Sequence, residues 1–417
     1  MPFFGWRVVW ASFAVAVFAW GVGFYGPSVF LYALHEGRGW PVSTISAAIT
    51  VHFLLSAGIV ARLPALHGRY GLVAATRAGG VLAGLGVVLW ATVPAPWLLF
   101  PAALVSGAGW ALTSGAAINA MVAPWFDKKR PAAISMAFNG ASVGGVLFAP
   151  LWALLIARLG FPLSAGLLGV TMAAGLWWIA GTYLRATPAD VGQRPDGEAA
   201  PVAGAPLASP VRQLLPVGTA MWRDRRFATL STAFALGLFA QIGLVAHLFL
   251  LLAPALGATG AGMAVSLATA CAVVGRTLLG SLLPARADRR VAAALNFAVQ
   301  VGGCLALLAA GGTSVPLLLL GCVLFGLGIG NLTSLPPLIA QTEFPRADVG
   351  RVVALVTAIN QAVFAFAPAI LGAVRDATSW AGAPILLAAL VQIAAAAMVL
   401  AGRAARKGQD ADAGHGP

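Results

Sequence analysis

Two side chains that could do chemistry lie inside long apolar stretches of the sequence. Arg276 follows about fifteen mostly apolar residues, and His247 lies within the apolar stretch before it. A guanidinium holds a carboxylate through two parallel hydrogen bonds, so Arg276 is expected to bind an anion. An imidazole titrates near neutral pH, so His247 is expected either to hydrogen-bond the same ligand or to carry a proton.

The elements that must position these side chains are membrane-spanning helices. The chain has 417 residues, of which 60% are hydrophobic and 9% are charged. Soluble domains carry roughly 25% charged residues, so the polar surface here is too small to keep a chain of this length in water. If each span and its turn take about 30 residues, the length predicts twelve spans.

The apolar runs fall into two groups of six. We predict spans at 7–32, 44–66, 73–93, 97–122, 131–157 and 162–184, and then at 226–252, 262–284, 289–310, 314–340, 349–373 and 380–402. The fold class is therefore an all-α membrane protein with two six-helix bundles, at 1–184 and 226–402. The polar segment 185–225 predicts a cytoplasmic linker, and 403–417 predicts a disordered cytoplasmic tail.

Faint internal repetition accompanies this division. Ala137-Phe138-Asn139-Gly140-Ala141 in the fifth run is echoed by Ala358-Ile359-Asn360-Gln361-Ala362 in the eleventh. Gly107-x-Gly109 in the fourth run matches either Gly328-x-Gly330 or Gly326-x-Gly328 in the tenth. A duplicated carrier, with equivalent spans around a central site, would show such a pattern.

Lysine and arginine residues indicate the orientation of the spans, because they concentrate in cytoplasmic loops. With the N-terminus inside, twenty basic residues fall on the inner side, and three, Arg38, Arg158 and Arg375, on the outer side. Arg62 lies near a membrane edge, so Arg276 is expected to be the one deep cation. We expect a multi-pass protein of a bacterial-type inner membrane with both termini cytoplasmic.

A structural role stays open for both candidate residues. A charge at the bilayer centre costs at least about 2.5 kcal/mol on the mildest scale. Arg276 could reduce this cost by snorkelling or by bonding helix carbonyls, and His247 could be neutral and bonded to a neighbouring helix. All twelve acidic residues fall in predicted loops or tails, so we expect no mid-membrane carboxylate beside Arg276. An anionic ligand would then supply the negative charge.

Other polar side chains inside the predicted spans could contact the same ligand. We include Tyr25, Asn119, Asn139 and Asn360 as candidate ligand-binding residues. Polar residues inside spans also serve as hydrogen-bonding contacts between helices, and that alternative stays open for each of them.

Five different short motifs are found along the chain. They are Gly5-Trp6-Arg7-Val8-Val9, Gly21-x-x-Phe24-Tyr25-Gly26, Gly39-Trp40-Pro41-Val42-Ser43-Thr44-Ile45-Ser46, Trp125-Phe126-Asp127-Lys128-Lys129-Arg130 and Gly275-Arg276-x-x-x-Gly280. Together they resemble the major facilitator superfamily over almost the whole chain. Within it, the sequence is most similar to the monocarboxylate-transporter and oxalate/formate-antiporter group.

The resemblance implies gating loops, and this sequence departs from the family pattern in one of them. The loop at His67-Gly68-Arg69-Tyr70-Gly71 keeps Arg69 and Gly71 but lacks the family's acidic residue. The corresponding loop of the second half keeps Asp288, Arg289 and Arg290. In the animal-type carriers an aspartate precedes the span-eight arginine by one turn, where this chain has Ala272.

The resemblance implies a secondary transporter of small organic anions working by alternating access, as a proton symporter or an anion exchanger. A single deep cation favours a monocarboxylate over a dicarboxylate. The alternative is an exporter of amphipathic or drug-like compounds. We expect a monomer in the lipid bilayer, with no cofactor, no metal site and no catalytic residues. Because the basic residues lie in short clusters between apolar runs, we expect no nucleic-acid partner despite the net charge of +13.

Overall fold

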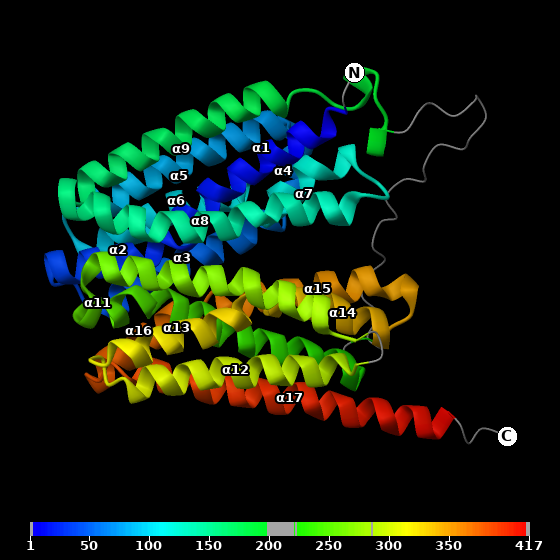
Figure 1. Ribbon diagram of the computed structural model, residues 1–417. Coiled ribbons are helices and arrows are strands. Elements are labelled where there is room, and N and C mark those ends of the chain that lie inside the picture. Colours follow the sequence, from blue (N-terminus) through cyan, green and yellow to red (C-terminus); the bar gives the residue numbers. More distant parts are fainter. Residues whose placement is uncertain (1–2, 198–220, 222, 285–286, 414–417) are drawn as a thin grey trace. The chain divides into compact units, whose positions relative to one another are not determined.

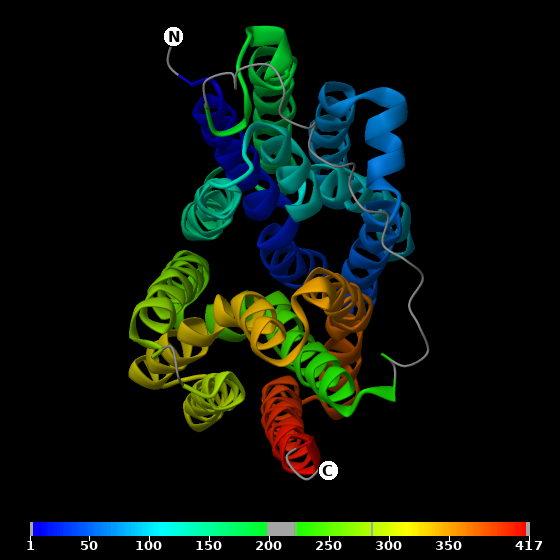
Figure 2. The ribbon, with the colours of Figure 1, turned by 90° about the vertical axis from the view of Figure 1, so that its right-hand side faces the viewer.

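The computed structural model describes residues 3–197, 221, 223–284 and 287–413. This part of the chain folds almost entirely into helices and contains no strand (Figure 1). Turned by 90°, the helices of each half are seen roughly end-on (Figure 2). The predicted all-α membrane fold is therefore confirmed.

Eleven helical segments of the described chain are long and apolar enough to cross a membrane. One of them, α11 (Arg225–Leu282), has 58 residues, which is more than twice the length that a span needs. It bends at Gly257, which has a φ of 67° and a ψ of 170°. Glycine adopts this conformation readily because it has no Cβ. Because α11 supplies two spans, the twelve predicted spans are accounted for. Its bend lies within the predicted gap at 253–261.

Contacts between Cα atoms divide the chain into two units. Unit 1 comprises residues 1–40 and 51–213, and unit 2 comprises residues 41–50 and 214–417. Helix α3 (Val42–Val60) therefore begins in unit 2 and ends in unit 1. Residues 198–220 of the predicted linker lie outside the described residues, and the predicted domain boundaries stay predictions.

Unit 1 is a bundle in which spans 1 and 4 are interrupted helices. Its helices are α1 (Gly5–Phe18), the π-helix η1 (Ala19–Phe24), α2 (Gly26–Arg38), the second part of α3, α4 (Leu63–Tyr70), α5 (Leu72–Thr92), α6 (Leu99–Thr113), α7 (Gly115–Val122), α8 (Arg130–Leu159) and α9 (Phe161–Tyr183), with short 3₁₀ turns at Pro96–Leu98, Ala123–Trp125, Ala189–Val191 and Pro195–Gly197. The helix α5 packs against α6 and α9, and α1 packs against α8. Glycines allow these close approaches: a Cβ at Gly140 or Gly144 would overlap the α1 backbone.

Span 1 contains one wide turn. The π-helix η1 lies between α1 and α2, and the backbone N–H of Tyr25 donates to the carbonyl of Trp20 at 2.9 Å. A π turn holds more residues than an α turn, and short π segments are frequent at functional sites. Tyr25 directly follows this turn.

The start of the predicted linker is anchored within unit 1. The Asp196 carboxylate accepts hydrogen bonds from the backbone N–H groups of Asp127, Lys128 and Lys129. These three bonds outweigh the effect of burial, so the pKa of Asp196 is lowered. The loop between spans 4 and 5 and the segment 195–197 are thereby held together.

Unit 2 contains the second group of helices. They are the first part of α3, α11, α12 (Arg289–Ala309), α13 (Val315–Ile329), α14 (Asn331–Glu343), α15 (Arg346–Phe364), α16 (Ala367–Thr378) and α17 (Ala383–Ala413). Its α11 packs against α13, α15 and α17. The last helix extends past the predicted end of span 12, and residues 414–417 lie outside the described residues.

A chain of three amides crosses the apolar interior of unit 2. Gln392 donates to the side-chain oxygen of Gln300 at 2.7 Å, and Gln300 donates to that of Gln241 at 2.9 Å. All three side chains are buried. Spans 7, 9 and 12 are thus joined by hydrogen bonds. In a membrane, lipid is as apolar as the helix surfaces, so such bonds help to hold helices together where the hydrophobic effect does not.

The two units use their glycines in the same way. In unit 1, a Cβ at Gly107 would meet the backbone of His52, and one at Gly109 would meet that of Ala83. In unit 2, a Cβ at Gly326 would meet the backbone of Ala268, and one at Gly328 the side chain of Gln300. The structural counterpart of Gly107-x-Gly109 is therefore Gly326-x-Gly328, the second of the two predicted matches.

Candidate functional site

Arg276 lies where α11 approaches the junction of α13 and α14. A Cβ on Gly275 would overlap the carbonyl of Leu327, and a Cβ on Gly330 would lie 2.6 Å from the carbonyl of Ala272. Because both positions are glycine, the helices approach closely enough for Arg276 Nε to donate to the Gly330 carbonyl at 3.3 Å. The side chain of Arg276 is partly exposed. The hydrogen bond from Arg276 to a helix carbonyl is the kind of contact expected if Arg276 has a structural role.

The depth of Arg276 follows from its place in α11. It lies six residues before Leu282, where the helix ends, or about 9 Å along the axis. It is nearer to that end than to the Gly257 bend, but it remains inside the span.

His247 is fully buried in unit 2 and bonded through both ring nitrogens. Nδ1 lies 2.9 Å from the carbonyl of Gly243, and Nε2 lies 3.0 Å from Ser46 Oγ. Because a carbonyl only accepts, the neutral ring carries its proton on Nδ1, and Ser46 donates to Nε2. A Cβ on Gly372 would lie 2.5 Å from Ser46 Oγ, so that glycine makes room for the serine.

His247 and Arg276 lie on opposite sides of the bend at Gly257. His247 precedes it by ten residues and Arg276 follows it by nineteen. At 1.5 Å per residue the two lie roughly 15 Å and 28 Å from the bend, so their depths differ by roughly 13 Å. A three-carbon acid is too short to contact both side chains at once.

The other predicted ligand residues divide between the units. Asn360 is buried in unit 2, and its Oδ1 has no donor among the described residues. Tyr25 is buried in unit 1, where the hydroxyl of Ser28 donates to its carbonyl at 2.8 Å. Asn119 on α7 and Asn139 on α8 are exposed within unit 1. An exposed amide inside a span is costly against hydrocarbon, which indicates a watered face.

Aromatic rings gather beside these two asparagines, a feature that the sequence analysis did not single out. The ring of Trp20 lies 4.9 Å from that of Trp110 and 5.8 Å from that of Phe138. A Cβ on Gly115, one helical turn before Asn119, would meet Phe138 at 3.2 Å. Residues four apart share a helix face, so Asn119 lies on the same side of α7 as this aromatic cluster.

The predicted gating residues of the second half form a helix cap and a buried ion pair. Asp288 accepts from the backbone N–H of Arg290 at 2.9 Å and from Arg403 Nε at 2.7 Å. Burial alone would raise the pKa of Asp288, but these hydrogen bonds outweigh it, and its pKa is lowered. Arg289 donates to the carbonyl of Pro284 at 3.2 Å.

Arg290 is buried against Glu343, which the sequence analysis placed in a loop. The carboxylate accepts from Nε and Nη2 of Arg290, both at 2.7 Å. Glu343 is the last residue of α14 and is 7% exposed, so its assignment to a loop was wrong. Arg226 Nη1 also donates to the Glu343 carbonyl at 3.0 Å.

A repeated tripeptide could have revealed this cluster. Asp224-Arg225-Arg226 precedes α11 as Asp288-Arg289-Arg290 precedes α12. Each aspartate caps its helix by accepting from the backbone N–H two residues on, and each second arginine reaches Glu343. An aspartate directly before an apolar run is a helix-start signal.

In the first half, the predicted gating residues Arg69 and Gly71 lie at the end of α4. The guanidinium carbon of Arg69 is 5.3 Å from the ring centre of Tyr70. Gly71 ends the helix with φ 81° and ψ 156°. In the same loop, burial lowers the pKa of His67.

The family model of the Major Facilitator Superfamily matches residues 114–368, which is more than half of the chain. The chain therefore belongs to the major facilitator superfamily, as its motifs suggested, and it is a transporter and not an enzyme.

Individual relatives extend this comparison. The chain is 28% identical over 238 residues to monocarboxylate transporter 11 of Mus musculus, covering 56% of this chain and 48% of that protein. It thus spans about half the length of this curated relative. The nucleoside transporter NupG superposes with a TM-score of 0.75 at 12% identity, over 97% of this chain and 99% of that one. A bacterial homologue of the human lysosomal transporter Spinster gives 0.67 at 12% identity, over 97% and 96%. These two likenesses show the fold.

Proposed function

We propose that this protein is a secondary active transporter of small organic anions, above all monocarboxylates, working by alternating access. The observation that carries the proposal is Arg276, a partly exposed guanidinium held inside span 8 by two tightly packed glycines. A fixed cation in a span is costly, and such residues commonly mark substrate or ion pathways. The similarity to a protein named monocarboxylate transporter supports the same substrate class.

The guanidinium geometry explains why an arginine suits this role. Nε is engaged with the Gly330 carbonyl, which fixes the plane of the group against α14. A carboxylate binds a guanidinium through two parallel bonds, and a charge-assisted bond contributes about 1.5–3 kcal/mol. A lysine keeps the charge but loses the fork, so Arg276→Lys separates charge from geometry.

His247 is the candidate for proton coupling. In the neutral ring Nε2 accepts from Ser46, so protonation there requires the serine hydroxyl to turn and accept instead. Because His247 and Arg276 differ in depth, we assign the proton to His247 and the carboxylate to Arg276. Proton symport and anion exchange both fit this arrangement.

We further propose the orientation and location expected from the charge pattern. Twenty basic residues on one side predict that both termini are cytoplasmic, in a bacterial-type inner membrane. The transporting unit is proposed to be a monomer.

The second candidate function, export of amphipathic compounds, draws on the aromatic cluster of Trp20, Trp110 and Phe138. Aromatic rings beside exposed amides suit a substrate with a flat apolar body and a polar end. Under this alternative, Arg276 is structural and neutral amphiphiles are substrates.

Uptake into proteoliposomes tests both candidates. Labelled lactate, pyruvate and oxalate would be compared for the wild type, Arg276→Lys and Arg276→Ala. Arg77→Gln serves as the matched control, because Arg77 also donates to a helix carbonyl, that of Trp177. We expect monocarboxylate uptake to fall at least about tenfold in Arg276→Ala, less in Arg276→Lys, and not in Arg77→Gln.

Two outcomes would contradict these proposals. Full monocarboxylate uptake by Arg276→Ala would refute the anion site, and transport of neutral amphiphiles without carboxylates would favour the exporter. For coupling, symport predicts stimulation by an inward proton gradient and its loss in His247→Ala. Stimulation that persists in that variant would remove His247 as the proton site.

A further inference from the structure

Two helices, the first part of α3 and α16, cap each other within unit 2. The first N–H groups of a helix have no partner within it, so they need acceptors from elsewhere. The backbone N–H of Ser43, in the first turn of α3, donates to Asp376 Oδ2 at 2.8 Å. The N–H of Ala369, in the first turn of α16, donates to Thr50 Oγ1 at 3.1 Å. Residues 41–50, which we call the span 2 segment, are therefore fastened to α16 near both ends.

Between these caps, Ser46 of the span 2 segment covers His247. Ser43, Ser46 and Thr50 are spaced three and four residues apart, so they lie on one face of α3. Ser46 Oγ lies 3.0 Å from His247 Nε2, and both side chains are 0% exposed. The close approach depends on Gly372 of α16, because a Cβ there would lie 2.5 Å from Ser46 Oγ. The two caps and this contact thus hold the same short segment.

The nitrogen of His247 that can accept a proton is closed off by this serine. Nδ1 of the neutral ring carries its proton and donates to the Gly243 carbonyl at 2.9 Å, so Nε2 is the nitrogen that can take another. The hydroxyl of Ser46 donates to Nε2 and occupies its lone pair. Because Ser46 is itself fully buried, its hydroxyl is not in contact with water and cannot pass a proton on. Nε2 therefore takes a proton from water only after Ser46 has moved away.

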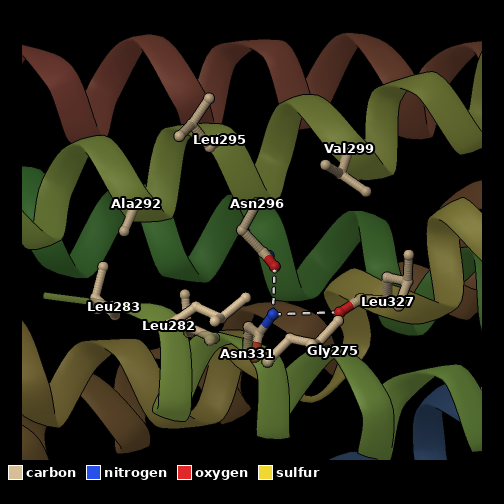
Figure 3. Close-up of a pocket in the computed structure, with 11 residues that line it drawn as sticks. Gly275, Leu282, Leu283, Ala292, Leu295, Asn296, Val299, Leu327 and Asn331 are labelled. Atoms are coloured by element: carbon tan, nitrogen blue, oxygen red, sulfur yellow. Dashed lines mark hydrogen bonds between the residues drawn. The ribbon is translucent and has the colours of Figure 1, made fainter.

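A cavity of about 330 Å³ in unit 2 offers no second route to His247 (Figure 3). Of its lining residues on α11, Gly275 is the nearest to the Gly257 bend, and it lies eighteen residues past it, or roughly 27 Å. His247 lies roughly 15 Å from the bend, so the two differ in depth by roughly 12 Å. The amides in the cavity wall, Asn296 and Asn331, hydrogen-bond to each other at 2.8 Å. The span 2 segment is left as the cover that must move.

The charged groups that interact with His247 in the described chain are Arg375 and Asp376, near the end of α16. An imidazolium is attracted by Asp376 and repelled by Arg375. Asp376 is exposed, and the same carboxylate caps the span 2 segment at Ser43. When that cap opens, the carboxylate keeps its charge and still attracts a protonated ring. Release of the segment and protonation of His247 are therefore compatible.

We propose that the span 2 segment is the proton gate of His247: Nε2 meets water when residues 41–50 leave α11 and α16, and it is shut off when the two caps form again. This inference rests on the proposed role of His247 as the proton site. Because α3 continues as one helix into unit 1, a movement of that unit carries Ser46 with it and links proton binding to alternating access. In the proposed orientation this end of span 2 faces outside, from which a symporter takes its protons.

Covalent labelling of histidines tests the gate. Diethyl pyrocarbonate reacts with uncovered neutral imidazoles, and mass spectrometry of the full-length protein labelled in nanodiscs gives a rate for each histidine. Asp376→Ala removes one cap, and Thr50→Val removes the other while keeping the shape of the side chain. We expect each variant to raise the rate at His247 at least about threefold, because the loss of one helix cap populates the open segment. Thr50→Ser keeps the acceptor and should label as the wild type does.

Two controls separate the gate from a loss of structure. Asp190→Ala is the matched variant, because Asp190 also caps a short turn, accepting from the N–H of Thr187 at 2.8 Å, but belongs to unit 1. It should leave the rate at His247 unchanged. His52 is the internal control, since it lies on α3 as well but in unit 1, where it is 2% exposed. Its rate should stay constant in every variant.

Unchanged labelling of His247 in both cap variants would overturn the proposal. An equal rise at His52 in Thr50→Val would overturn it as well, because the movement would then not be confined to residues 41–50. Thr50→Val decides the question even if Asp376→Ala does not fold. Labelling measures the gate without transport, so these outcomes are distinct from gradient stimulation that persists in His247→Ala, which would remove His247 as the proton site.

Discussion

The buried ion pair between Arg290 and Glu343 gives the sharpest stability prediction. Arg290 is 1% exposed, and its guanidinium donates to five acceptors on three other spans. Two are the carboxylate oxygens of Glu343, and the others are Thr229 Oγ1 and the carbonyls of Val399 and Arg226. Every N–H of the guanidinium is therefore used.

Glu343→Gln removes the negative charge and leaves the cation enclosed. Breaking a buried pair by removing one partner costs about 3–5 kcal/mol, because the remaining charge is uncompensated. The glutamine amide also presents an NH₂ group to a guanidinium that can only donate. For a unit of about 200 residues, this cost corresponds to a fall in melting temperature of roughly 6–20 °C.

The assay is thermal unfolding of the purified protein, followed by tryptophan fluorescence. Asp224→Asn is the matched control, because Asp224 caps α11 and pairs with Arg226 at 3.0 Å while both side chains are partly exposed. An asparagine keeps the cap, and a partly exposed pair contributes about 0–1 kcal/mol, so the control should melt within a few degrees of the wild type. The double variant Arg290→Met/Glu343→Leu should recover much of the loss. Melting of Glu343→Gln within 2 °C of the control would refute this reasoning.

Three further predictions concern unit 2. Gly275→Ala should destabilise the protein by about 1–3 kcal/mol, because the added Cβ overlaps α13. Gly280→Ala on the same helix has open space around it and should leave the stability unchanged. Equal melting temperatures of the two variants would contradict the close approach at Gly275. Gly257→Ala should cost about 1–3 kcal/mol from backbone strain alone, measured by the same melts. The lowered pKa of Asp288 means that its bond to Arg403 stabilises above the unfolded value of 3.8 and is lost as pH falls through the folded value. The difference in melting temperature between the wild type and Asp288→Asn should thus be present at pH 7 and should close as the pH falls below 3.8 through the lowered pKa of Asp288. A difference that widens in acid would contradict this prediction.

Hydropathy was sufficient to predict the spans because a chain in lipid must be apolar over each crossing. The break near Gly257 could be placed for the same reason, since two spans need a turn between them. Arg276 inside span 8 could also be found, because a charge in an apolar run is conspicuous.

The partners of these residues could not be predicted, because they come from distant parts of the chain. Ser46 meets His247 from 201 residues away, and Gly330 meets Arg276 from 54 residues away. The burial of Glu343 was missed because a carboxylate at a span boundary looks like a loop residue until its arginine is known. The aromatic cluster was missed because tryptophan and phenylalanine are ordinary in apolar helices.

The π turn at Ala19–Phe24 also has no signal in a uniformly apolar run, yet it affects how span 1 tolerates changes in length. In an α-helix, deleting one residue rotates everything downstream by about 100°, since a turn holds 3.6 residues. A π turn already accommodates one residue more than the α turn, so removing one residue there returns the segment to α geometry. Both flanks, with Ser12 before and Tyr25 after, would keep their facing neighbours. Span 1 can therefore lose a single residue at this turn. The same deletion elsewhere in the span would rotate the residues that follow it away from their packing partners.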